Sequence, residues 1–84
     1  MDRKVDKAMD LLLSKFEVDP IAYTSYNNGF IFAAYPKGLK KEKRKNIMNT
    51  LYLVDLKTNS AGPFSIAFDI DGFHKASENF KKIE

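Results

Sequence analysis

The sequence predicts an α+β fold in which a four-stranded antiparallel meander is flanked by an N-terminal and a C-terminal helix. A helix-periodic apolar stripe opens the chain and a short amphipathic segment closes it. Between them lie four β-favouring runs, near 21–26, 30–35, 50–56 and 64–68. Because short or medium loops join these runs, an α-β-β-β-β-α meander is the simplest topology. A chain of 84 residues predicts a single domain, 1–84.

The first helix is expected over residues 2–16. Its apolar positions recur at helical spacings of three and four: Val5, Ala8, Met9, Leu12, Leu13 and Phe16. Asp2 and Asp6 suit the positive end of the helix dipole, and Lys15 suits the negative end. Pro20 prevents continuation, because the residue before a proline is pushed toward an extended conformation.

The first hairpin is signalled by Asn27-Asn28-Gly29, since Asn-Gly between β-favouring runs is a strong short-range hairpin signal. The returning strand, 30–35, is apolar on both faces. One face carries Phe30, Phe32 and Ala34, and the other carries Ile31, Ala33 and Tyr35. An antiparallel sheet open to water on one face alternates apolar and polar residues, so both faces of this strand need cover.

A second hairpin is expected over residues 50–68. Its turn contains Asn59, which tolerates a left-handed backbone. Phe64, Ile66 and Phe68 alternate with smaller residues, which is typical of a fourth strand with one strongly apolar face.

Asp71 is expected to cap a final helix with an apolar side. That side carries Phe73, Ala76, Phe80 and Ile83. Lys81 and Lys82 suit the negative end of the same helix. The expected core of the domain comprises Leu12, Phe16, Phe32, Leu53, Phe64, Ile66, Phe68 and Phe80.

The positive charge is concentrated in one loop. The sequence has a net charge of +3, from 14 basic and 11 acidic residues. Residues 37–45 hold six cations against Glu42, a local net of +5, which leaves 8 basic and 10 acidic residues elsewhere, a net of −2. The six cations are Lys37, Lys40, Lys41, Lys43, Arg44 and Lys45.

This loop has two interpretations. Its positive field would attract phosphates or an acidic partner, and Tyr35 beside it could stack on a base. Alternatively, it is a solvated loop, with a short helical turn within 39–48, that keeps a small domain in solution. The second interpretation is preferred, because the sequence carries no nucleic-acid-binding motif.

The inventory of reactive side chains is thin. A serine-type triad would need His74, the single histidine, with Ser65 or Ser77 and an aspartate, but the spacing resembles no nucleophile elbow. Three carboxylates could be considered for a hard cation: Asp69, Asp71 and Glu78. They lack the alternating oxygen ligands of a calcium loop. We therefore expect a non-enzymatic protein with no catalytic, cofactor-binding or metal-binding residues.

The composition also indicates a compartment. The chain contains no cysteine, which fits a reducing environment. It has no apolar run of about 18 residues, the length that a transmembrane helix needs. Residues 1–4 lead into a polar, periodic helix rather than a signal-peptide core. These features predict a cytoplasmic protein that does not enter a membrane.

Parts of the chain resemble a known group. The segment Leu53-Val54-Asp55-Leu56-Lys57-Thr58-Asn59, followed by Gly62-Pro63-Phe64-Ser65 and a helix from Asp71, is similar to small uncharacterised proteins of tailed bacteriophages and prophages. These share an opening helix, an aromatic hairpin ending in Pro-Lys, and an Asp-x-Lys-Thr-Gly-like hairpin. Here Asn59 stands in place of the glycine. The resemblance implies a phage origin, with a host-cytoplasmic or virion-assembly setting, and brings no catalytic residues.

Two functions remain in competition. The first is a phage or prophage accessory protein that binds a host or phage protein, or a second copy of itself. The expected homodimer would place Tyr35, Tyr52 and Val54 near the contact, where the doubly apolar strands need cover. The alternative is a nucleic-acid-associated protein that binds through loop 37–45.

Overall fold

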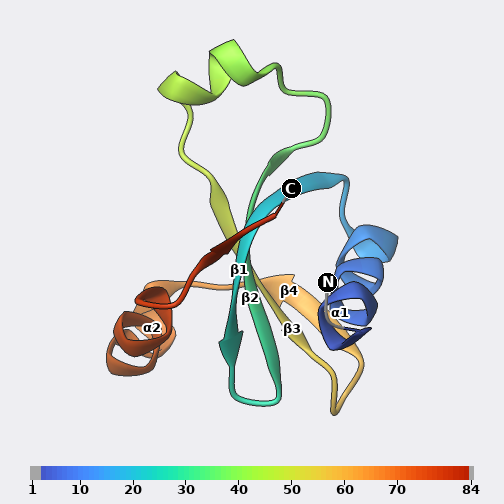
Figure 1. Ribbon diagram of the computed structural model, residues 1–84, viewed down its shortest axis with the longest axis vertical. Coiled ribbons are helices and arrows are strands. Elements are labelled where there is room, and N and C mark those ends of the chain that lie inside the picture. Colours follow the sequence, from blue (N-terminus) through green and yellow to red (C-terminus); the bar gives the residue numbers. More distant parts are fainter. Residues whose placement is uncertain (1–2, 84) are drawn as a thin grey trace.

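The computed structural model describes residues 3–83 and places two helices on opposite sides of a five-stranded antiparallel sheet (Figure 1). The elements are α1 (Arg3–Lys15), β1 (Val18–Tyr26), β2 (Gly29–Pro36), η1 (Lys41–Asn46), β3 (Thr50–Asp55), β4 (Ser60–Pro63), η2 (Ile66–Phe68), α2 (Ile70–Ser77) and β5 (Lys81–Lys82), where η denotes a 3₁₀ helix. The strands lie in the order β4-β3-β2-β1-β5. The predicted α+β class is confirmed, as is the short helical turn within 39–48.

The helix α1 closes one face of the sheet, which we call the α1 face. Its apolar stripe packs against β2, β3 and β4, as its helical spacing predicts. Val5, Ala8 and Leu12 are at most 2% exposed. Across from them, Phe32 and Val54 are fully buried. This layer is the hydrophobic core of the domain.

Two asparagines and one glycine shape the hairpins. Asn27 (φ 49°) and Asn59 (φ 54°) both adopt the left-handed backbone that the turns require, as expected for Asn59. Gly29 lies outside the turn, as the first residue of β2. A Cβ there would overlap the carbonyl oxygen of Val54, so glycine is what lets β2 and β3 approach.

The strand β1 is longer than expected because it begins at Val18 instead of Ile21. The register against β2 shifts between Pro20 and Ala22, which marks a β-bulge. A bulge is one of the few places where a strand tolerates proline.

The fourth strand is displaced from its expected position. β4 precedes Phe64, and 64–68 is not a strand. The amide of Phe64 still donates to the carbonyl of Leu51 (2.9 Å). Ser65 then accepts from the amide of Ala67 (3.3 Å) and caps η2, which turns the chain out of the sheet.

The expected core is therefore only partly correct. Three members are buried: Leu12, Phe32 and Phe64. Three others are half-buried: Phe16, Leu53 and Phe80. The prediction was wrong for Ile66 and Phe68, which are 45% and 76% exposed, because they lie on η2 instead of facing the sheet.

The last helix differs from the expectation at both ends. Its N-cap is Asp69, whose side chain accepts from the amide of Gly72 (3.0 Å), and not Asp71. The helix ends at Ser77, and the chain returns as β5, with Lys81 and Lys82 paired to β1. The two lysines are thus edge-strand residues, a common way to protect a sheet edge.

Candidate binding groove

The second face of the sheet, which we call the α2 face, is covered at two places and open between them. At one place α2 lies over Thr24, whose hydroxyl donates to the carbonyl of Ala76 (2.7 Å), and the paired Ile31 is fully buried. At the other, the guanidinium of Arg44 lies 5.0 Å from the ring centroid of Tyr35. Both covering segments lie on the same side of the ribbon (Figure 1).

An apolar groove of about 730 Å³ occupies the open part of the α2 face. Its floor is formed by Ala22, Ala33 and Leu51, one residue from each of β1, β2 and β3. Alanine side chains fill little space above the sheet, so the groove lies between the two covered places.

One wall of the groove is aromatic. The ring of Phe64 packs against Tyr26 (centroids 5.4 Å apart) and against Phe73 (5.9 Å). Phe73 packs in turn against Phe80 (6.3 Å). Ile66 completes this wall. The rings are held by one another and by α2, so the wall is preformed.

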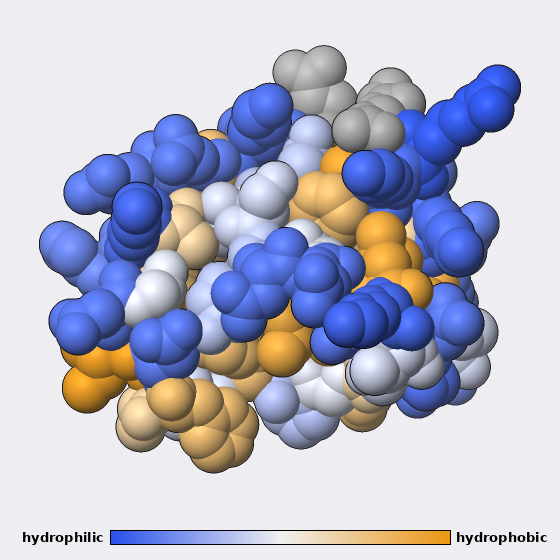
Figure 2. Space-filling view, turned by 90° about the horizontal axis from the view of Figure 1, so that it is seen from below, coloured by the Kyte–Doolittle hydropathy of each residue, from blue (hydrophilic) through white to orange (hydrophobic). Residues whose placement is uncertain are grey.

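The other wall is the end of the loop between β2 and β3, where Met48 and Asn49 line the groove. Two residues that line the walls are exposed, Met48 (91%) and Ile66 (45%). Further exposed apolar side chains lie close to them in the chain: Ile47 (42%), Phe68 (76%) and Ile70 (64%). Seen from below, hydrophobic atoms gather at the lower left of a mostly hydrophilic surface, on the side where α2 lies (Figure 2). Exposed apolar patches of this kind mark interaction sites.

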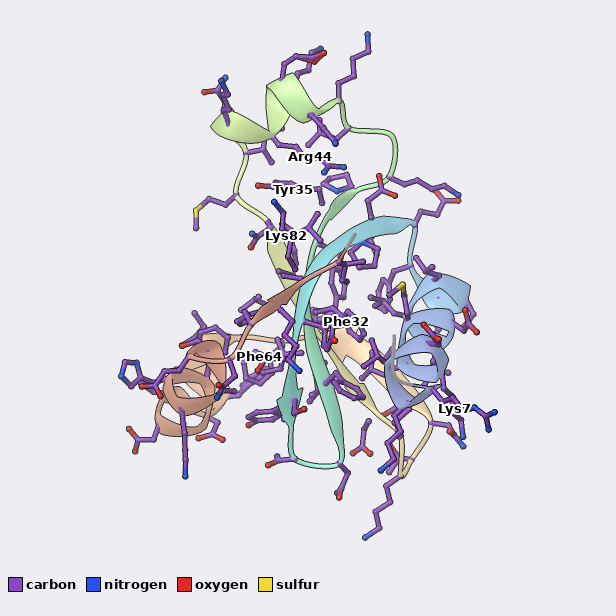
Figure 3. The ribbon with its side chains drawn as sticks, viewed as in Figure 1. Lys7, Phe32, Tyr35, Arg44, Phe64 and Lys82 are labelled. Atoms are coloured by element: carbon purple, nitrogen blue, oxygen red, sulfur yellow. The ribbon has the colours of Figure 1, made fainter. Side chains whose placement is uncertain are left out.

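Basic residues lie on two segments that flank the groove, the loop between β2 and β3 and the strand β5, although none of those described lines it. The loop cation Arg44 is held in place, since it lies over Tyr35 and pairs with Asp19 (3.6 Å) (Figure 3). The other predicted loop cations are exposed and have no ion pair within residues 3–83: Lys37, Lys40, Lys41, Lys43 and Lys45. Lys82 pairs with Ala22 in the sheet register and therefore projects from the same face as the groove floor.

The residues predicted for a dimer contact do not share a face. Val54 is fully buried beneath α1, and the ring of Tyr52 packs 4.9 Å from Phe16 on that side. Tyr35 lies on the opposite face beneath Arg44. Val54 therefore offers no surface to a second chain, whereas the groove is an open apolar surface within residues 3–83.

A partly buried polar contact fixes α2 at the end of the groove. The Tyr26 hydroxyl donates to Asp69 Oδ2 (2.6 Å). This bond, followed by the one from the Gly72 amide, holds the pKa of the Asp69 carboxyl below its ordinary value. The same bond to Asp69 raises the pKa of Tyr26. The pair ties the N-terminus of α2 to the end of β1.

Three of the residues considered for catalysis or metal binding have side chains that serve local structure. Ser65 caps η2, and the Ser77 hydroxyl donates to the backbone carbonyl of His74 (2.8 Å). Asp69 caps α2 and accepts from Tyr26. Within residues 3–83 no three His, Cys, Asp or Glu side chains are grouped as metal ligands would be.

Comparison with protein-family models, with curated proteins and with solved structures finds no match to this chain. In the described part of the chain, neither helix has the length and apolar character needed to cross a bilayer. The groove itself was missed at the sequence level. The sequence signal in this region was the apolar spacing of Phe64, Ile66 and Phe68, which indicated a fourth strand instead.

Proposed function

We propose that this chain is a non-enzymatic protein-binding module and that the groove on its α2 face is the binding site. The observation that carries the proposal is a preformed apolar groove whose rim exposes large hydrophobic side chains. A monomer that bound nothing would expose less continuous apolar surface. Met48 on the rim suits a surface that adapts to a partner, because methionine is flexible and polarisable.

Selection from a displayed library of random peptides tests the proposal. The immobilised chain should enrich peptides with apolar residues at a helical or a strand spacing. Amide chemical shifts in NMR spectra should change most at Ala22, Ala33 and Leu51 when such a peptide is added. Changes confined to α1, or no enrichment at all, would contradict the proposal.

A matched pair of variants localises the site. Ile66 on the groove wall and Leu13 on α1 are each 45% exposed, so glutamine at either position should have similar effects on folding. Ile66→Gln should weaken peptide binding by about tenfold, since it removes the burial of a large aliphatic side chain. Leu13→Gln should leave binding unchanged.

Nucleic-acid binding remains the second candidate, supported by the exposed lysines of loop 37–45. It is less favoured because Arg44 already covers one face of the Tyr35 ring, the ring we expected to stack on a base. Retention on heparin distinguishes the two. Strong retention that falls steeply with salt and disappears when the lysines become glutamate would favour nucleic acid.

The proposal includes the setting that the sequence implies: a cytoplasmic protein of phage or prophage origin. The absence of cysteine supports a reducing compartment. The resemblance of the 53–65 region to phage proteins supports the origin. The partner is accordingly a segment of a host or phage protein, or a second copy of this chain.

A further inference from the structure

On the loop side of the groove, most of the charged side chains are positive. The wall that ends in Met48 belongs to the loop that carries Lys41, Lys43 and Lys45, all exposed, against Glu42. Within residues 3–83 these three lysines form no ion pair. None of these lysines lines the groove, but Lys45 precedes Met48 by three residues, so this flank of the groove favours an acidic ligand over a basic one.

A second source of positive charge lies on the strand that borders the floor. Lys82 projects from the groove face of β5, beside Ala22. In the view of Figure 3, Lys82 lies between the middle of the sheet and the loop that carries Arg44. The loop and β5 thus present positive charge along the same part of the rim.

The wall formed by η2 and α2 is different. Its rim is apolar, and the charged side chains of α2 are Asp71 and Lys75. Glu78 follows directly as the C-cap. With Asp69 as the N-cap, three acidic residues stand against one basic residue, which gives this wall a net charge of −2. The groove is therefore polarised, with cations on the loop side and hydrophobic rings on the other.

On these observations, and resting on the proposed protein-binding function, we infer that the groove takes an acidic amphipathic segment of another protein. The apolar side chains of the segment fill the space above Ala22, Ala33 and Leu51. Its Asp and Glu residues lie along the loop side, facing the lysines of η1 and Lys82. Burial supplies most of the affinity, while the charges set the orientation and speed the encounter.

A second copy of this chain fits the site less well. In a symmetric dimer built groove to groove, each lysine-rich loop would meet either the other loop or the partner's α2 wall. The first arrangement opposes two loops of net +5. The second offers a wall of net −2 to that charge. Neither neutralises the rim, whereas an acidic segment does.

Peptide selection also tests this inference. Peptides of about 15 residues, long enough to form a helix on binding, should be enriched in Asp and Glu on one side of their apolar row. A selected peptide is then synthesised with its acidic residues intact, and again with glutamine in their place. The acidic peptide should bind about tenfold more tightly at low salt, and the difference should shrink as salt rises.

Two matched sets of charge reversals in the protein test which lysines cause the preference for the acidic peptide. The triple change Lys41→Glu, Lys43→Glu and Lys45→Glu should abolish the preference for the acidic peptide and leave the binding of the glutamine peptide intact. The control reverses Lys7, Lys15 and Lys57, which are exposed elsewhere, so the net charge changes equally. The control should keep the preference. Lys7 lies on α1, across the sheet from the groove (Figure 3).

Each of the other possible results of these experiments would overturn the inference. Selected peptides without an acidic excess, binding at Ala33 and Leu51, would overturn the inference and leave the protein-binding function standing. No groove-binding peptide would overturn both. Self-association in sedimentation equilibrium that Met48→Gln abolishes would make a second copy the occupant. An oligonucleotide that displaces the peptide and depends on the same lysines would make nucleic acid the occupant.

Discussion

The two faces of the sheet both receive apolar side chains from β2, but they are covered to different extents. β2 presents Phe30, Phe32 and Ala34 to one side, and Ile31, Ala33 and Tyr35 to the other. The α1 face is covered by a helix of 13 residues, whereas α2 has 8. At 1.5 Å per residue these lengths are about 20 Å and 12 Å. A long helix closes its face into a core, and a short one leaves part of its face as a groove.

The division also separates stability from binding. Side chains between α1 and the sheet are buried on all sides, so their loss leaves cavities. Side chains on the groove rim are largely exposed, so their loss costs the fold little. Substitutions matched across the two faces can therefore test whether one face supplies the stability and the other the binding surface.

The largest difference is expected between Leu12 and Ile66. Leu12→Ala should lower the free energy of unfolding by about 2–5 kcal/mol, because Leu12 is 0% exposed in the α1 core. Ile66→Ala should cost under about 1 kcal/mol, because that side chain is 45% exposed. Urea denaturation at neutral pH measures both. Equal costs would mean that the α2 face is as tightly packed as the α1 face.

A smaller difference is expected within the basic loop. Arg44→Ala should cost about 1 kcal/mol, because it removes the contact with Tyr35 and the pair with Asp19. Lys43→Ala, an exposed neighbour with no ion pair within residues 3–83, should change stability by less than about 0.5 kcal/mol. If both variants behave alike, Arg44 does not hold the loop against the sheet.

The contrast between the faces explains which parts of the fold the sequence predicts. α1 has a 3.6-residue apolar period, and the turns at Asn27 and Asn59 have residues that tolerate positive φ, so local chemistry identifies all three. The period-two spacing of Phe64, Ile66 and Phe68 suits a strand equally well. In the structure Phe64 packs against Phe68 and against Phe73 of α2, and residues 66–68 form η2.

The groove was beyond prediction for a related reason. The groove is the part of the sheet that no helix or loop covers. Its position therefore depends on where α2 lies. The position of α2 follows from contacts between distant residues, such as Tyr26 with Asp69 and Thr24 with the carbonyl of Ala76. The basic loop, in contrast, was found from its composition alone, although the special role of Arg44 was not.

The contact that fixes α2 should be visible in the pH dependence of stability. The hydrogen bond from Tyr26 lowers the pKa of Asp69 in the folded state. The contribution of the carboxylate is therefore complete above the unfolded-state pKa, and is lost as the pH falls through the folded-state value. Asparagine still caps a helix, so Asp69→Asn should flatten the acid limb of melting temperature against pH. If the unchanged protein and Asp69→Asn have parallel acid limbs, the ionised carboxylate of Asp69 does not contribute to stability.

The smallest effect is expected at the most exposed apolar residue. Met48 is 91% exposed, so Met48→Gln should change the free energy of unfolding by less than about 0.5 kcal/mol. The same variant should weaken binding of a groove-selected peptide several-fold, because Met48 lines the groove wall. Urea denaturation and peptide titration on one protein sample give both numbers. A loss of stability as large as that of Leu12→Ala would instead make Met48 part of the core and remove the distinction between the two faces.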